Sequence, residues 1–124
     1  MGNEPGIRWA EAMAAKDRDK LREVLAEVVD FRGMTPGSFW EASSPDEVFE
    51  ILFDNWFEDK DHIEEVLVAE PGDDVGDRHR VSYRFRIENP DGPHECEQQM
   101  YYESDGDRIT LARIMCSGFR PVPG

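Results

Sequence analysis

Cysteine, lysine and long apolar runs are scarce in this sequence, and each scarcity excludes a class of protein. Two cysteines in 124 residues are too few for a disulfide scaffold. No apolar run approaches the length that crosses a bilayer, and the first residues lack the basic start of a secretion signal. We therefore expect reduced thiols and a soluble, cytoplasmic protein.

Positive charge is also scarce. The chain carries 28 acidic residues against 3 lysines and 11 arginines, which gives a net charge of −14. A surface of this sign repels phosphate backbones and anionic lipids, so we expect neither a nucleic-acid nor a membrane partner. A hydrophobic content of 39% argues against disorder, and the length suits one domain over residues 1–124.

Several motifs of cofactor and metal chemistry are missing. The sequence has no phosphate-binding glycine loop, no dinucleotide glycine pattern and no nucleophile elbow. His62, His79 and His94 are not at zinc-ligand spacing. The acidic stretch 71–77 has the composition of a turn and lacks the ligand order of a calcium loop. We expect no metal and no organic cofactor.

The N-terminal half is predicted to be helical in three places. Asn3 and Asp17 are candidate caps for the first two helices, and the second keeps apolar helical spacing from Leu21 to Val28. Ser44-Pro45-Asp46-Glu47 is a capping box that begins a third helix reaching about residue 57. Between them we expect a short strand at 28–32 and an ordered loop at 34–40 that folds back over the core.

The C-terminal half alternates with the period of strands. Strands are predicted at 63–69 and 81–87, followed by one long hairpin over 92–119 with Asp105-Gly106 as its two-residue turn. That turn would pair Ser104 with Asp107, set Gln98 opposite Arg113 and direct Cys96 and Cys116 to opposite faces. Helices first and antiparallel strands second indicate an α+β fold, with the helices on one face of a curved sheet.

Five segments, in this order and spacing, resemble one superfamily: Ile7–Asp17, Phe31–Gly33, Ser44–Phe49, Asp105–Ile109 and Cys116–Pro121. They are similar to the nuclear transport factor 2-like superfamily, and in particular to its SnoaL-like domains. The resemblance implies a cone in which three N-terminal helices pack on a strongly curved, mixed but mainly antiparallel sheet. It also implies a pocket inside the cone and a homodimer through the outer sheet face.

The superfamily includes cyclases, isomerases, dehydratases, epoxide hydrolases and proteins without catalysis, so fold alone does not assign a function. Compared with the isomerases, this chain has Trp9, Gly33 and Gln99 where the resemblance places the oxyanion-holding tyrosine, the general base and the proton-sharing aspartate. Asp30 lies a few residues from the general-base match. Isomerase chemistry of that kind is therefore not expected.

The same alignment directs Glu97, Gln99 and Tyr101 into the pocket and leaves Cys96, Met100, Tyr102, Ile109, Leu111 and Met115 on an apolar outer face. Glu97, with Asp30 in reserve, becomes the candidate for proton transfer. The candidate ligand-binding residues are Trp9, Met13, Trp40, Phe53, Tyr83, Gln99, Tyr101 and Ile114.

Two functions follow from this assignment. The first is binding of a small, largely hydrophobic molecule, with cofactor-free acid/base chemistry of cyclase, isomerase or dehydratase type. The alternative is a non-catalytic, dimerising module that binds a ligand or serves a structural role.

Overall fold

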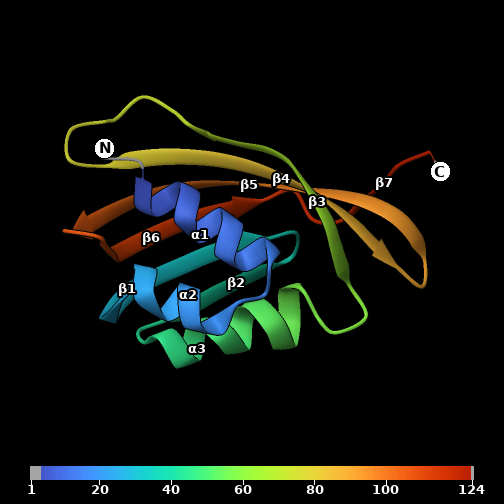
Figure 1. Ribbon diagram of the computed structural model, residues 1–124, viewed down its shortest axis with the longest axis horizontal. Coiled ribbons are helices and arrows are strands. Elements are labelled where there is room, and N and C mark those ends of the chain that lie inside the picture. The colour runs from blue at the N-terminus through green and yellow to red at the C-terminus, as the bar shows by residue number, and fades with distance from the viewer. Residues whose placement is uncertain (1–3, 124) are drawn as a thin grey trace.

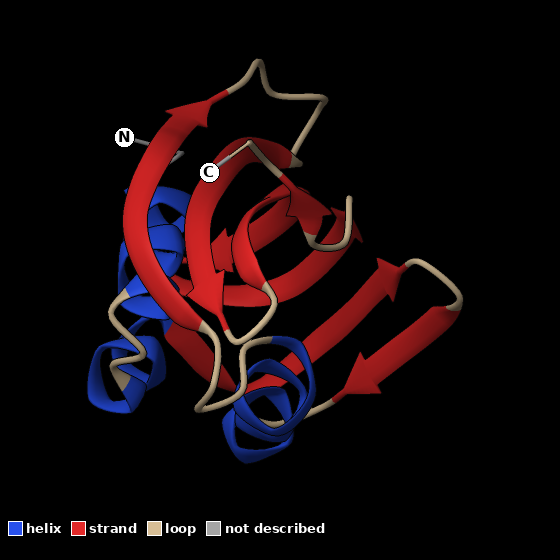
Figure 2. Ribbon diagram, turned by 90° about the vertical axis from the view of Figure 1, so that its right-hand side faces the viewer, coloured by secondary structure: helices blue, strands red, loops and turns tan. Residues whose placement is uncertain are grey.

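The computed structural model describes residues 4–123 and has an α+β architecture, with helices packed against one curved sheet (Figures 1 and 2). The elements are α1 (Glu4–Ala14), α2 (Arg18–Val24), β1 (Leu25–Thr35), β2 (Ser38–Ala42), α3 (Pro45–Ile51), the π-helical turn η1 (Leu52–Trp56), β3 (His62–Pro71), β4 (His79–Asn89), β5 (Gly92–Asp105), β6 (Arg108–Cys116) and β7 (Arg120–Pro121). No helix within residues 4–123 is both long enough and apolar enough to cross a membrane.

The strands form one sheet in the order β2-β1-β6-β5-β4-β3, with β7 added beside β5. All neighbours are antiparallel except β1 and β6, which run parallel. Figure 2 shows the strands bending around the interior, and the helices lie against the sheet in both views. The expected fold class, three N-terminal helices on a curved and mainly antiparallel sheet, is confirmed.

Local signals place two of the helix starts correctly. The Asp17 carboxylate accepts a hydrogen bond from the backbone N–H of Lys20 and caps α2. The Ser44 hydroxyl accepts one from the N–H of Glu47, whose carboxylate in turn accepts from Ser43. The expected cap at Asn3 lies outside the described residues.

The N-terminal strands extend further than the sequence suggests. The second helix stops at Val24, and Leu25 already belongs to β1, so the expected helical positions Leu25 and Val28 are wrong. Pairing of β1 with both β2 and β6 outweighs the local helical spacing. The expected loop at 34–40 is instead a hairpin, with a turn at 36–37 and β2 after it.

The β5–β6 hairpin differs from its predicted register in two ways. Asp105 pairs with Arg108, so the turn lies one residue later than expected. A bulge then shifts the register beyond Glu103, and Gln98 faces Cys116 instead of Arg113. Because one extra residue reverses the inward and outward positions of one strand relative to the other, Cys96 and Cys116 lie on the same face and not on opposite faces.

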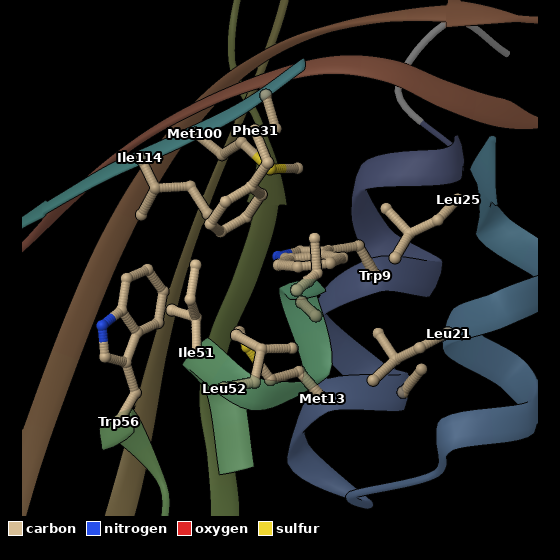
Figure 3. Close-up of a cluster of buried hydrophobic side chains, with 14 of the residues drawn as sticks. Trp9, Met13, Leu21, Leu25, Phe31, Ile51, Leu52, Trp56, Met100 and Ile114 are labelled. Atoms are coloured by element: carbon tan, nitrogen blue, oxygen red, sulfur yellow. The ribbon is translucent and has the colours of Figure 1, made fainter. Parts of the chain in front are cut away.

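The interior of the sheet is filled by apolar side chains from all layers (Figure 3). Trp9 from α1 packs against Phe31 from β1, and Met13 and Leu52 are buried in the same core cluster. The buried positions of β5 are His94, Cys96, Gln98, Met100 and Tyr102. Cys96, Met100, Tyr102 and Ile109 are therefore interior residues, and their expected place on the outer face is wrong.

Candidate functional site: a cavity at one end of the sheet

A cavity of about 380 Å³ lies where the β1–β2 turn, the segment after α3, the β4–β5 turn and the end of β6 come together. We call it the end cavity; Figure 2 views the molecule from this end. Aromatic rings supply much of its wall: Trp40, Trp56, Phe57 and Phe119. Thr35 holds Trp40 in place, because its hydroxyl accepts a hydrogen bond from the indole nitrogen at 2.8 Å.

The polar side chains of the interior also gather at this cavity. Among the described residues, Asp61, His94 and Gln98 are the polar or charged side chains that are buried, and all three line the end cavity. Burying a polar group costs free energy unless it is hydrogen-bonded, so three such groups at one place need an explanation. Their convergence marks the cavity as the candidate site.

Gln98 is held by a buried chain of hydrogen bonds. The Trp9 indole N–H donates to the Tyr83 hydroxyl at 3.0 Å, and that hydroxyl donates to the Gln98 carbonyl oxygen at 2.6 Å. Burial raises the pKa of Tyr83 well above its usual value, so the hydroxyl keeps its proton. Because the carbonyl oxygen of Gln98 already accepts from Tyr83, its amide nitrogen is the group that remains as a hydrogen-bond donor.

Two buried side-chain N–H donors lack a well-formed hydrogen bond within the described part of the chain. They are Nε2 of Gln98 and the indole nitrogen of Trp56. Gln98 lies close enough to the Cys116 sulfur to lower the pKa of that thiol, but the contact falls short of good hydrogen-bond geometry. Both residues line the end cavity, and their nitrogen atoms are buried just behind its surface.

Trp56 reaches this position because residue 33 is glycine. A Cβ on Gly33 would lie 2.7 Å from the edge of the Trp56 ring. The absence of a side chain lets the indole pack on β1, and Trp40 meets it edge-on with ring centroids 6.4 Å apart. In Figure 3 the Trp56 nitrogen lies on the side away from Phe31 and Leu52. Gly33 therefore shapes the aromatic wall.

Asp61 and its neighbours fix the loop at the cavity rim. The Asp61 carboxylate accepts from the side-chain amide of Asn89 at 3.0 Å and from the backbone N–H of Glu58 at 3.1 Å. The Lys16 ammonium donates to the backbone carbonyls of Glu58 and Asp61, and burial is the main cause of its lowered pKa. This network positions the carboxylate beside the cavity.

The two cysteines meet in the cavity wall, with their sulfur atoms 3.5 Å apart. Cys96 is buried, whereas Cys116 is partly exposed. The Gly118 N–H donates to the Cys116 sulfur at 3.4 Å. Hydrogen bonding from Cys96 lowers the pKa of Cys116, and the same contact, with burial, raises the pKa of Cys96. Cys116 is thus the thiol of the pair that ionises first.

The candidates for proton transfer lie elsewhere. Glu97 faces outward on β5, where its carboxylate accepts from Arg84 at 2.7 Å, so the expected inward direction is wrong. Asp30 is paired with Arg113 at 3.0 Å, and the hydrogen bond from Arg113 lowers the pKa of Asp30. Neither residue lines the end cavity. The bulge sets the register of the hairpin, and Cys96, Gln98 and Met100 point inward on β5. Glu97, which lies between Cys96 and Gln98, therefore points outward.

The structure disperses the ligand-binding candidates as well. Trp40 lines the end cavity, and Tyr83 reaches it only through Gln98. Trp9, Met13 and Ile114 are core residues, and Phe53 lies under the Arg18 guanidinium. Gln99 and Tyr101 are exposed, so their expected inward position is wrong.

Sequence reasoning missed Trp56, Gln98, Asp61 and Cys96 as cavity residues, whereas Cys116 was expected on the pocket side. A signal for Gln98 was present: Cys96, Met100 and Tyr102 alternate with Glu95, Glu97 and Gln99, and that alternation favours burial of the even-numbered positions. No comparable signal marks Trp56 or Asp61, because Trp56 ends the π-helical turn η1 and Asp61 lies in the connection that follows it, which tertiary contacts arrange.

Comparison with known proteins supports the architecture. No family model matches the sequence, and no curated protein matches it either. Among solved structures, a candidate isomerase from Bacillus subtilis has a TM-score of 0.77 and 13% identity, over 94% of this chain and 86% of that one. A protein of ketosteroid isomerase-like fold from Catenulispora acidiphila, in complex with trimethylamine, has a TM-score of 0.67 and 15% identity, over 94% and 88%.

A candidate SnoaL-like polyketide cyclase from Mesorhizobium loti has a TM-score of 0.59 and 12% identity, over 90% of this chain and 95% of that one. The chain has the nuclear transport factor 2-like fold. At these identities the likeness extends to the architecture alone, so the function of this chain has to be argued from its own cavity.

Proposed function

We propose that the protein binds a small, largely hydrophobic and uncharged molecule in the end cavity, through a hydrogen-bond acceptor on that molecule. The observation that carries the proposal is that two buried N–H donors without a well-formed hydrogen bond belong to residues of one aromatic cavity wall, Gln98 and Trp56. Ligand sites combine an apolar lining with a few placed polar groups, and a buried donor gains most from a partner when it otherwise has none.

The size and charge of the cavity restrict the ligand further. A volume of about 380 Å³ lies at the small end of the range for ligand pockets, which favours a molecule of one or two rings. The charged residues at its lining are Glu58, Asp61 and Asp91, against Lys60. This excess of negative charge disfavours anionic ligands.

Acid/base chemistry of isomerase or cyclase type is the finer form of this proposal. Asp61 supports it, because it is the buried carboxylate among the described residues and it lines the cavity. A ketone held by Gln98 and Trp56 would be polarised by the two N–H groups, and Asp61 would take a proton from the carbon beside the carbonyl. This assigns proton transfer to Asp61 in place of Glu97 and Asp30.

The binding test uses ligands and variants in matched pairs. Acetophenone and ethylbenzene have similar size, but only the ketone offers an acceptor; binding is measured by tryptophan fluorescence and by thermal shift. We expect the ketone to bind more tightly. Gln98→Met should weaken ketone binding about tenfold, since one hydrogen bond contributes about 1 to 1.5 kcal/mol. The affinity for ethylbenzene should not change.

Gln99→Met is the matched control, because it makes the same change at the neighbouring, exposed position. It should bind both ligands as the wild type does. Equal affinity of the wild-type protein for ketone and hydrocarbon would reject the acceptor-binding proposal. For the chemistry, exchange of the acetophenone methyl protons in heavy water, followed by NMR, should be accelerated by the wild type and not by Asp61→Asn.

We also propose a homodimer through the outer sheet face. Four large apolar side chains are exposed there or beside it: Met34, Phe39, Tyr101 and Met115. They line one groove of about 390 Å³ together with Gln99 and Arg113. An apolar surface of this kind is typical of an interface, and a second copy of the chain would cover it.

A further inference from the structure

We propose that Cys96 and Cys116 form a peroxide-reactive dithiol that closes to an intramolecular disulfide across β5 and β6. The sulfur atoms are already 3.5 Å apart, on two strands that lie next to each other in the sheet. Formation of the bond would bring the sulfur atoms from 3.5 Å to about 2 Å. This modification site does not depend on the proposed ligand.

The surroundings give the two thiols different roles. Cys116 is the more exposed member, and its sulfur accepts a hydrogen bond from the Gly118 N–H at 3.4 Å. This donor stabilises a thiolate at Cys116. Cys96 is buried and held as a neutral thiol beside it. Cys116 is therefore the attacking sulfur and Cys96 the resolving one.

The reaction balances with hydrogen peroxide as the named oxidant. The Cys116 thiolate attacks one peroxide oxygen, the O–O bond breaks, and the leaving hydroxide takes a proton to become water. Cys116 is then a sulfenic acid. The Cys96 sulfur attacks the Cys116 sulfur, the S–O bond breaks, and the leaving oxygen takes the Cys96 proton and departs as a second water. The two thiols are oxidised, and peroxide is reduced.

The cavity lets a small oxidant reach this pair. Both cysteines line the end cavity, whose volume of about 380 Å³ admits peroxide readily. The closed bond would join β5 to β6 near the C-terminal end of β6, where Gln98 pairs with Cys116.

The test treats the folded protein with equimolar hydrogen peroxide at neutral pH and follows it by intact mass, peptide mapping and non-reducing electrophoresis. We expect a monomeric product that has lost two hydrogens, with the 96–116 bond identified by mapping and reversed by dithiothreitol. A product that stays fully reduced, a disulfide between chains, or oxidation past the sulfenic state in the wild type would each overturn the proposal.

Two variants separate the roles. Cys116→Ser should slow peroxide consumption about tenfold or more, because only the buried neutral thiol remains. Cys96→Ala should still react with peroxide, more slowly than the wild type because Cys116 loses the hydrogen bond that lowers its pKa, and should accumulate a sulfenic acid at Cys116 that dimedone traps. Circular dichroism confirms that each variant is folded. If Cys96→Ala lost reactivity and Cys116→Ser kept it, the assignment of roles would be wrong, and the wild-type mass result would still decide whether the disulfide forms.

Discussion

Replacing Tyr83 with Phe should destabilise the protein strongly for the loss of a single oxygen atom. That hydroxyl accepts from Trp9 and donates to Gln98, and all three residues are buried. Its removal leaves one donor and one acceptor without a partner. Each orphaned buried group costs about 1 to 3 kcal/mol, so for the two groups we expect a loss of about 2 to 6 kcal/mol in the free energy of unfolding.

For a chain of 124 residues this loss corresponds to a fall of about 8 to 23 °C in Tm. Urea unfolding followed by tryptophan fluorescence measures the free energy, and calorimetry measures Tm. Tyr101→Phe is the matched control: it removes a hydroxyl from an exposed residue and should change stability by less than about 0.5 kcal/mol.

A second substitution tests the cause. Adding Gln98→Met to Tyr83→Phe removes the orphaned carbonyl, so the double variant should be more stable than the sum of the two single losses. If Tyr83→Phe stays within about 0.5 kcal/mol of the wild type, the hydrogen-bond chain does not hold the interior as we argue. Strict additivity in the double variant would show that Gln98 and Tyr83 are energetically independent.

Three further predictions concern the cavity wall, the outer face and the thiols. Gly33→Ala should displace the Trp56 ring, cost about 1 to 3 kcal/mol and change the tryptophan emission; unchanged emission and stability would contradict the packing described. The wild type should sediment as a dimer at micromolar concentration and the double variant Phe39→Asp, Met115→Asp as a folded monomer, whereas a monomeric wild type would refute the interface. The rate at which iodoacetamide alkylates Cys116 should rise with pH and level off at a lower pH in the wild type than in Cys96→Ala. The reason is that hydrogen bonding from Cys96 lowers the pKa of Cys116. Identical pH profiles in the two proteins would contradict this.

The order of helices and strands was predictable from local signals. Ser44-Pro45 and Asp17 are caps in the sequence and in the structure, and the alternation from Val81 to Ile87 gives the core of β4. These features depend on neighbours a few residues away. The sequence alone therefore supports the fold class and most of the element order.

The candidate site was harder to predict because it depends on a single bulge. The register shift beyond Glu103 decides which side of β6 faces which side of β5 and brings Cys116 to Cys96. The resemblance to the isomerases placed Gln99 in the pocket, one residue from the buried Gln98. In this strand the alternation of charged and apolar residues was the better guide.

The parallel pairing of β1 with β6 has a consequence for the order in which the chain can fold. From β3 to β6 each strand pairs with the next along the chain, so this meander needs only local closures. Phe31 pairs with Ala112, and β1 with its hairpin partner β2 enters the sheet only through β6. Long-range pairing of this kind forms slowly, because the loop-closure entropy is lost before the contacts form. A chain cut before β6 would leave β1 and β5 with open edges and a strong tendency to aggregate.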